Sequence, residues 1–327
     1  MKLIIQIPCY NEEETLPQTF NDLPKQIEGV DIIEYLIIND GSTDRTVEVA
    51  RELGIHHIVN FSNNKGLARG FMAGVDACLR LGADIIVNTD ADNQYVGGDI
   101  KKLVLPILSG KADIVIGERP ISDIEHFSSM KKKMQKFGSL VVRIASGTTV
   151  PDAPSGFRAY SREAAMQINV INRYTYTLET IIQAGENKTA MVSVPIRTNP
   201  ETRESRLFKS MWGYMKRSAG VIIRSVVMYR PMRFFMVVGG VLFLAGMAIN
   251  VRYLILLIMG TTGAHTQSLI LAAALVIIGF QTIVVGLLAD VVAANRKILE
   301  DIQLRIKRLE YAPSDDKDPS EKTTESD

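Results

Sequence analysis

The sequence is poor in cysteine, with only Cys9 and Cys78 among its 327 residues. Each lies in an apolar context, one in a first strand and the other in an expected helix. Two such residues do not make a disulfide framework, so we expect the globular part of the chain to work in a reducing compartment. The N-terminal apolar run over 3–7 is also too short for a secretory signal peptide, and it ends at Pro8.

The sequence also lacks an excess of charge of either sign. Lys and Arg total 37 and Asp and Glu total 36, which gives a formal net charge of +1. Nucleic-acid-binding domains usually carry a basic excess, so the composition predicts no nucleic acid partner. No internal repeat is visible, and the length is typical of about two domains.

The first 200 or so residues alternate short runs of β-branched residues with helical patterns. The runs predict strands over 3–7, 32–38, 57–59, 85–88 and 114–116, with helices over 67–81 and 100–108. This order predicts an α/β domain over 1–204 with a mainly parallel, Rossmann-like sheet. Ligands bind such sheets at the carboxyl ends of the strands, where four polar clusters fall: YNEEE, NDGSTD, SNNKG and TDADNQY.

Two apolar runs further along the chain predict a transmembrane hairpin within 234–292, with helices over about 234–259 and 268–290. The second run would extend roughly 33 Å, enough to cross a bilayer. Lys and Arg flank the hairpin and are absent from its connecting loop over 260–267. The positive-inside rule therefore predicts an integral protein of the cell membrane with the first domain and both termini cytoplasmic. A buried hairpin in a large soluble core is the alternative.

The segments around this hairpin are amphipathic or polar. Residues 205–233 mix basic, aromatic and apolar side chains, which predicts a helix lying in the membrane surface or packed on the first domain. Residues 293–327 would continue the second helix in the cytoplasm and end in a disordered polar tail. Glycines at 239, 240, 246, 279 and 286 would allow close helix approach, and a homo-oligomer through the hairpin is possible.

Two acidic residues, Asp90 and Asp92, flank one alanine directly after an expected strand. Carboxylates this close repel each other, and a cation beside them relieves the repulsion. Mg²⁺ or Mn²⁺ prefers oxygen ligands and leaves positions for phosphate oxygens, and Gln94 offers one more oxygen. The pattern predicts a metal site that neutralises a departing diphosphate. A solvated polar loop is the plain alternative.

Other polar residues at the strand ends suit a nucleotide. Asp40 could accept hydrogen bonds from a base or ribose, and Glu12 could bind the ribose or stabilise a helix N-terminus. Tyr10 could flank the base, although a packing role suits it equally. Lys65 and Gly66 open a helix, where main-chain N–H groups favour an anion.

The segments IPCYNEEE, INDGSTDRT, NKGLARGFMAG, NTDADNQY, VIGER and DAPSGFRAYSREA together resemble the inverting family-two glycosyltransferases of GT-A fold, over about 1–206. DADNQY, GER and SGFRAY followed by a two-span hairpin are similar to polyprenyl-phosphate or dolichyl-phosphate hexose synthases. The resemblance implies nucleotide contacts from Pro8, Tyr10, Glu12 and Asp40. It implies metal ligation by Asp90, Asp92 and Gln94, and acceptor-phosphate contacts from Arg119, Arg203, Arg206 and Lys209.

The expected activity is therefore a metal-dependent transfer, with inversion, of a hexose or N-acetylhexosamine from a nucleotide sugar to polyprenyl or dolichyl phosphate. A phosphate monoester is already ionised near neutral pH, so it attacks without a general base. If a base were needed, Asp152 and Glu179 are the candidates. A UDP-sugar is favoured over GDP-mannose because DADNQY differs from the mannose synthases, while the sugar itself is not readable.

Three other functions stay open at this stage. The acceptor could carry a hydroxyl, as in a glycolipid or lipid-linked glycan. The chain could be a nucleotidyltransferase on a related sheet. It could also be a catalytically silent membrane scaffold that binds a nucleotide sugar.

Overall fold

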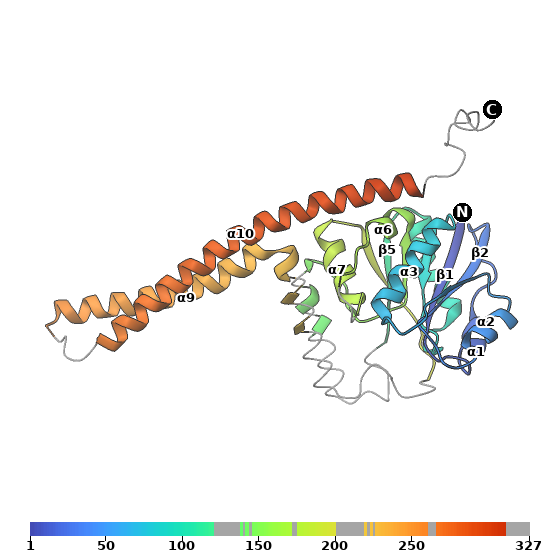
Figure 1. Cartoon of the computed structure of the whole chain (residues 1–327), viewed down its shortest axis with the longest axis horizontal. Helices are drawn as coiled ribbons and strands as arrows, with labels where there is room; N and C mark the ends of the chain where they lie inside the picture. The colour runs from blue at the N-terminus through green and yellow to red at the C-terminus, as the bar shows by residue number, and fades with distance from the viewer. Residues whose placement is uncertain are drawn as a thin grey trace, which may run out of the picture. The chain divides into compact units, whose positions relative to one another are not determined.

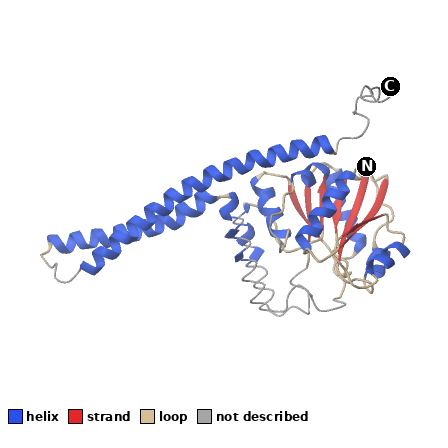
Figure 2. Cartoon of the chain, in the orientation of Figure 1, coloured by secondary structure: helices blue, strands red, loops and turns tan. Residues whose placement is uncertain are grey.

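The computed structural model describes residues 1–120, 138–139, 141–143, 146–171, 175–200, 219–220, 223–224, 226–260 and 266–311. By its internal contacts the chain divides into two compact units. One unit comprises Met1–Ile222 and Ile302–Asp327, and the other comprises Ile223–Asp301. Figures 1 and 2 show a mixed α/β fold for the first and a long helical hairpin for the second.

The first unit is built on a seven-stranded sheet in the order β3-β2-β1-β4-β6-β5-β7. Its strands are β1 (Lys2–Cys9), β2 (Ile32–Asn39), β3 (His57–Asn60), β4 (Ile85–Asn88), β5 (Ile114–Glu118), β6 (Arg158–Ser161) and β7 (Met191–Pro195). All neighbours are parallel except β6, which runs antiparallel to β4 and β5. The mainly parallel sheet and the five predicted strands are thus confirmed, whereas β6 and β7 were not predicted.

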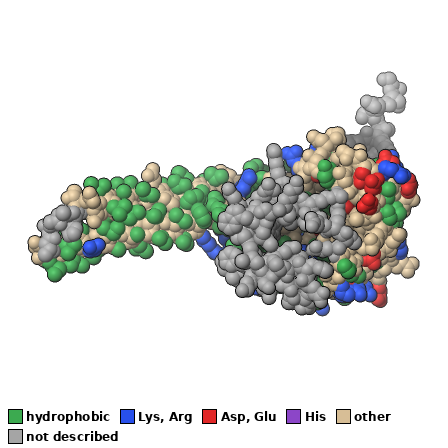
Figure 3. Space-filling view, turned by 90° about the horizontal axis from the view of Figure 1, so that it is seen from below, with side chains coloured by type: hydrophobic (Ala, Val, Ile, Leu, Met, Phe, Trp, Pro, Cys, Tyr) green, Lys and Arg blue, Asp and Glu red, His purple; other side chains and the backbone are tan. Residues whose placement is uncertain are grey.

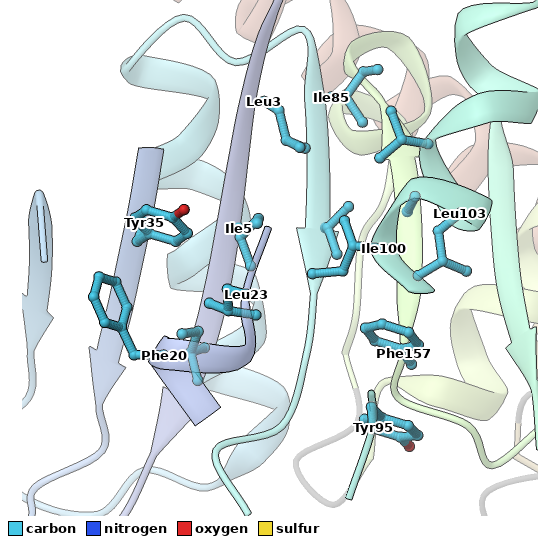
Figure 4. Packing of buried hydrophobic residues seen from close by; sticks show 14 of the residues in the cluster. Leu3, Ile5, Phe20, Leu23, Tyr35, Ile85, Tyr95, Ile100, Leu103 and Phe157 are labelled. Atoms are coloured by element: carbon cyan, nitrogen blue, oxygen red, sulfur yellow. The ribbon is translucent and has the colours of Figure 1, made fainter. Parts of the chain in front are cut away.

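Helices cover both faces of this sheet. They are α1 (Leu16–Asp22), α2 (Thr46–Glu52), α3 (Leu67–Arg80), α4 (Ile100–Leu108), α6 (Arg162–Gln167) and α7 (Thr177–Glu186), with a 3₁₀ turn η1 (Gly97–Asp99). Along β1, Leu3 and Ile5 face a core that includes Ile100 and Leu103 of α4, as Figure 4 shows. Because strands buried on both faces read as continuous apolar runs, the sequence revealed them well.

The second unit contains helices α9 (Pro231–Ile258) and most of α10 (Thr266–Glu310), both long and apolar enough to cross a membrane. Large apolar side chains cover their surface in Figure 3, and Leu244 and Leu288 are 67% and 64% exposed. In the most apolar 18-residue stretch of each helix, only 11% of α9 and 17% of α10 is buried. A hairpin in the core of a soluble protein would be mostly buried, so this exposure argues against that alternative. α10 continues beyond the apolar run ending at 290, up to Glu310.

The last turns of α10 belong to the first unit and are held there by polar contacts. The Arg162 guanidinium donates to the carbonyl oxygens of Ala83 (2.9 Å) and Tyr311 (2.7 Å), so it binds the C-terminal ends of α3 and α10 together. Arg80 forms an ion pair with Glu310 at 2.6 Å. Cations at helix C-termini are favourable because the terminal carbonyls carry partial negative charge.

Glycines allow α9 and α10 to approach each other closely. A Cβ atom built on Gly279 would lie 2.5 Å from the backbone nitrogen of Phe243, and one on Gly246 would lie 2.9 Å from the carbonyl of Ala272. A Cβ atom on Gly240 would meet nothing within 4 Å among the described residues. The close approach therefore occurs inside one hairpin, and the homo-oligomer stays a prediction.

Replacing Gly279 by leucine should force α9 and α10 apart, because backbone atoms of Phe243 occupy the space that the new side chain needs. Overpacking of this kind costs about 1–3 kcal/mol. Gly240→Leu is the matched control, since it adds the same side chain to open space. We expect the thermal midpoint of the purified protein in detergent to fall by several degrees for Gly279→Leu and to stay unchanged for Gly240→Leu. Equal effects of the two substitutions would contradict the packing described here.

Candidate active site

The polar loops that follow β1, β2, β3 and β4 leave one edge of the sheet. Cys9 at the end of β1 is in register with Asn39 at the end of β2, which in turn is in register with Asn60 of β3. On the other side of β1, Gln6 pairs with Asn88 at the end of β4. Because these strands are parallel, the four predicted polar clusters start at a common edge.

Asp40 holds the start of helix α3. Its carboxylate accepts hydrogen bonds from the backbone N–H groups of Lys65 (2.7 Å) and Gly66 (2.9 Å). This helix N-terminus was expected to attract an anion. It already binds one, the Asp40 carboxylate of the same chain. Gly41, at φ 73°, turns the chain so tightly that a Cβ atom would lie 2.5 Å from the backbone of Asn63. The role of Asp40 and Lys65 toward a nucleotide remains a prediction.

The other proposed nucleotide contacts lie at the end of β1 and in the loop after it. Pro8 is in register with Ile38 of β2, and the Tyr10 ring beyond it is 40% exposed. Glu12 is buried, and its carboxylate accepts a hydrogen bond from the hydroxyl of Thr15 at 2.7 Å. An exposed aromatic ring at this edge suits a flat nucleobase, whereas Glu12 is tied into its own turn.

The proposed metal ligands lie in the loop after β4, at residues 90–94. Asp90 and Asp92 are partly exposed, whereas Ala91 between them and Asn93 after them are buried. The backbone N–H of Gln94 donates to Asp92 Oδ1 at 3.1 Å. Burial, together with the neighbouring charge of Asp92, raises the pKa of Asp90 to about 7.

These carboxylates fit a divalent cation. Each disfavours ionisation of the other, and a cation beside them would remove that cost. Among the described residues no group of three His, Cys, Asp or Glu side chains is arranged to hold a metal. A site with two carboxylates and further oxygens from an amide, water and phosphate is typical of Mg²⁺ or Mn²⁺ bound with a nucleotide.

Binding of Mn²⁺ to the protein should weaken as the pH falls through 7. Asp90 must lose its proton to bind a cation, and its pKa is raised to about 7. Below that pH, each unit should raise the apparent Kd by up to about tenfold. Titration of the protein with Mn²⁺ between pH 6 and 8, without nucleotide, measures this dependence. An affinity that stays constant over this range would contradict the assignment of Asp90.

Arg119 and Asp152 form a bidentate ion pair beside the metal loop. Arg119 Nε lies 2.7 Å from Asp152 Oδ2, and Nη2 lies 2.9 Å from Oδ1. Asp152 is fully buried and the Arg119 side chain is 14% exposed. Burial alone would lower the pKa of Arg119, but the charge and hydrogen bonds of Asp152 outweigh it and raise that pKa. Arg119 therefore stays charged, and its Nη1 is the guanidinium nitrogen that does not contact Asp152.

The two candidate bases are poorly placed to accept a proton. Both carboxylate oxygens of Asp152 bind Arg119. Glu179 is buried on α7, where Oε1 accepts a hydrogen bond from the backbone of Ile171 at 3.2 Å. Both carboxylates are buried and already hydrogen-bonded, so neither is well placed to take a proton from an acceptor hydroxyl. This favours a reaction that needs no general base.

Arg158 is a buried site residue whose role sequence reasoning missed. Its guanidinium donates to the carbonyls of Ser155 (2.8 Å) and Ala153 (2.7 Å) and to the hydroxyl of Thr180 (2.8 Å), all uncharged acceptors. These bonds tie the loop before β6 to α7. The Arg158 charge also favours ionisation of Asp90. The SGFR motif contains this arginine, but no sequence pattern shows that it is buried.

Gly156 brings the same loop against the metal carboxylates. A Cβ atom at this position would lie 3.3 Å from both carboxylate oxygens of Asp90 and 3.0 Å from the Tyr176 hydroxyl. Asn88 at the end of β4 also holds this loop. Its Nδ2 donates to the Gly156 carbonyl at 2.9 Å and to the Tyr176 hydroxyl at 2.8 Å. Any larger residue than glycine would press on Asp90.

The other predicted acceptor-phosphate residues, Arg203, Arg206 and Lys209, lie outside the described residues. The same holds for most of the predicted interfacial segment over 205–233 and for the tail over 312–327. Their roles stay predictions.

Comparisons with known proteins show what the chain resembles in sequence. Residues 4–168 match the family model described as Glycosyl transferase family 2. A UDP-N-acetylglucosamine–dolichyl-phosphate N-acetylglucosaminyltransferase of Methanococcus voltae is 33% identical over 59% of this chain and 83% of that protein. An undecaprenyl-phosphate 4-deoxy-4-formamido-L-arabinose transferase of Photorhabdus laumondii is 27% identical over 93% of this chain and 91% of that protein, so its match includes the hairpin.

Solved structures share the fold. The structure of glucosyl-3-phosphoglycerate synthase from Mycobacterium tuberculosis, in complex with Mn²⁺, UDP and glucosyl-3-phosphoglycerate, aligns with a TM-score of 0.53. It is 17% identical and covers 69% of this chain and 78% of that one. At this identity the likeness establishes a GT-A fold and nothing finer.

Proposed function

The chain belongs to glycosyl transferase family 2, and from that premise we propose that it transfers a hexose or N-acetylhexosamine from a nucleotide sugar to polyprenyl or dolichyl monophosphate. The products would be a lipid-phosphate-linked sugar with inverted anomeric configuration and a nucleoside diphosphate. The names of its relatives support lipid-phosphate acceptors. Relatives named for N-acetylglucosamine and for mannose both occur, so the preference for a UDP-sugar over GDP-mannose rests on the DADNQY segment alone.

The observation that carries this proposal is the placement of opposite charges at one edge of the sheet. Asp90 and Asp92 lie in one loop, and the charge of Arg119 partly offsets the burial and the Asp92 charge that raise the pKa of Asp90. An enzyme that joins a sugar diphosphate to a phosphate must hold two anions close together. Carboxylates that would hold a cation and a neighbouring arginine supply the two kinds of group this requires.

The chemistry follows from these groups. A divalent cation, when bound by Asp90, Asp92 and Gln94, would neutralise the charge on the departing diphosphate. Arg119 would orient the lipid phosphate through Nη1, while Asp152 holds the other side of the guanidinium. One phosphate oxygen then forms a bond to the anomeric carbon as the bond to the diphosphate breaks on the opposite face. The attacking oxygen carries no proton, so no base is used.

The helical hairpin supports a lipid acceptor. A polyprenyl chain stays in the bilayer, so its phosphate remains at the membrane surface, and the catalytic domain must be held there. Helices α9 and α10 are long enough to provide this anchor. Lys and Arg on both outer sides of the hairpin, and their absence between 260 and 267, support a cytoplasmic catalytic domain and cytoplasmic termini.

Sugar transfer to polyprenyl phosphate and to the corresponding polyprenol tests this proposal. Purified protein, a panel of nucleotide sugars and Mn²⁺ should yield a glycosylated lipid only from the phosphate. Chelation by EDTA should stop the reaction, and added Mg²⁺ or Mn²⁺ should restore it. Equal transfer to the alcohol would support a hydroxyl acceptor instead and would remove the proposal.

A further inference from the structure

The chain segment after β7 runs along the metal loop in the opposite direction. Thr198 and Tyr95 form an antiparallel bridge outside the main sheet. The backbone N–H of Asn199 donates to the carbonyl of Gln94 at 2.8 Å, and that of Val96 donates to Arg197 at 3.4 Å. Residues 197–199 thus form one wall of the loop that carries the proposed metal ligands.

Asn199 makes a second contact with this loop through its side chain. Its Nδ2 donates to the carbonyl of Asn93 at 3.0 Å. Asn93 has a φ of 56°, in the left-handed region, which asparagine adopts more readily than most residues. Asn199 therefore binds two successive carbonyls, those of Asn93 and of the proposed ligand Gln94, at the point where the loop turns.

The register of this wall is fixed by an ion pair between a buried carboxylate and an exposed arginine. Asp99, directly after the metal loop, is fully buried and accepts hydrogen bonds from the backbone N–H of Arg197 and from its Nη2, both at 2.7 Å. Lys102 lies 3.0 Å from the same carboxylate. Burial opposes ionisation, but the hydrogen bonds from Arg197 dominate and lower the pKa of Asp99 to about 2. A shift of Arg197 by one residue would break both of its 2.7 Å hydrogen bonds to this carboxylate.

We propose that Asn199 is a positioning residue that holds the Gln94 ligand in place through the backbone of the metal loop. Its main-chain N–H and its Nδ2 bind adjacent carbonyls of this loop, so both hydrogen bonds act on the segment that carries the proposed ligands. The inference rests on the metal site of the proposed function.

Asn199→Ala tests this inference, with Asn169→Ala as the matched control. The Asn169 amide donates to Gln303 at 3.2 Å and contacts no residue of the metal loop among its recorded hydrogen bonds. We expect Asn199→Ala to raise the Kd for Mn²⁺ about tenfold, the effect of losing a residue that orients a metal ligand. Asn169→Ala should leave this Kd unchanged.

A double-mutant cycle separates positioning from general damage. In a Gln94→Ala background the ligand that Asn199 holds is gone, so Asn199→Ala should change the Mn²⁺ affinity by less than about twofold. An equal effect in both backgrounds, or an unchanged Kd in the single variant, would overturn the inference. Should Asn199→Ala not fold, Asn199→Ser serves instead, because its shorter hydroxyl does not reach the Asn93 carbonyl. If wild-type protein transferred no sugar to lipid phosphate, the proposed function would fail, while the Mn²⁺ titrations would still decide the role of Asn199.

Discussion

Replacing Asp92 by asparagine is expected to lower the rate of sugar transfer by at least about a hundredfold. A cation that neutralises a departing diphosphate contributes several kcal/mol, and each 1.4 kcal/mol is about a factor of ten in rate. Asparagine keeps the side-chain oxygen that accepts the hydrogen bond from the Gln94 N–H, so the loop retains its conformation and only the charge is lost. Initial rates at fixed Mn²⁺ and saturating donor measure the effect.

The thermal midpoint of Asp92→Asn should match that of the wild-type protein, which serves as the control for folding. A variant that transfers sugar at the wild-type rate would show that the Asp-Ala-Asp segment does not hold the cation. The same experiment separates an enzyme from a silent scaffold, because a scaffold has no activity to lose.

Replacing Arg119 by alanine is expected to abolish transfer and also to destabilise the fold by about 3–5 kcal/mol. The substitution leaves the Asp152 carboxylate fully buried without its bidentate partner, and an unpaired buried charge carries a cost of this size. Denaturant unfolding of the first unit, followed by its tyrosine fluorescence or circular dichroism, gives the stability. Transfer assays on the folded fraction give the rate.

The Arg119→Ala/Asp152→Ala double variant distinguishes the two effects. Removing both charges should recover part of the lost stability, because no buried charge is left unpaired. Activity should stay absent, since no guanidinium remains to orient the acceptor phosphate. Stability losses that simply add in the double variant would show that the two residues do not act as a pair.

Much of the fold was predictable because four of the first five strands, β1, β2, β4 and β5, are largely buried. The runs over 3–7 and 85–88 are apolar on both sheet faces, so hydrophobicity alone marks them. The two strands that were missed lack this signal. Strand β6 begins with the buried charge of Arg158, and β7 at the sheet edge is only partly buried, which breaks its apolar pattern.

The candidate site was predictable only where it depends on strand ends. Ligands bind at the carboxyl ends of parallel strands, and this rule predicts from sequence alone that Asp40, Asp90 and Asp92 lie at a common edge of the sheet. The partners of these residues could not be predicted in this way. Arg119 and Asp152 are 33 residues apart, and Asn199 meets Asn93 across 106 residues. Such pairs depend on how distant loops pack, which leaves no periodic trace in the sequence.

The mass of the lipid product tests the central claim most directly. Purified protein is incubated with a nucleotide sugar, polyprenyl phosphate and Mn²⁺, and the lipid fraction is measured by mass spectrometry. The account predicts a lipid that has gained one hexose or N-acetylhexosamine and still carries a single phosphate, with no such product in EDTA. A lipid that had gained a sugar 1-phosphate, and so carried two phosphates, or a product formed equally well without divalent cations, would contradict it.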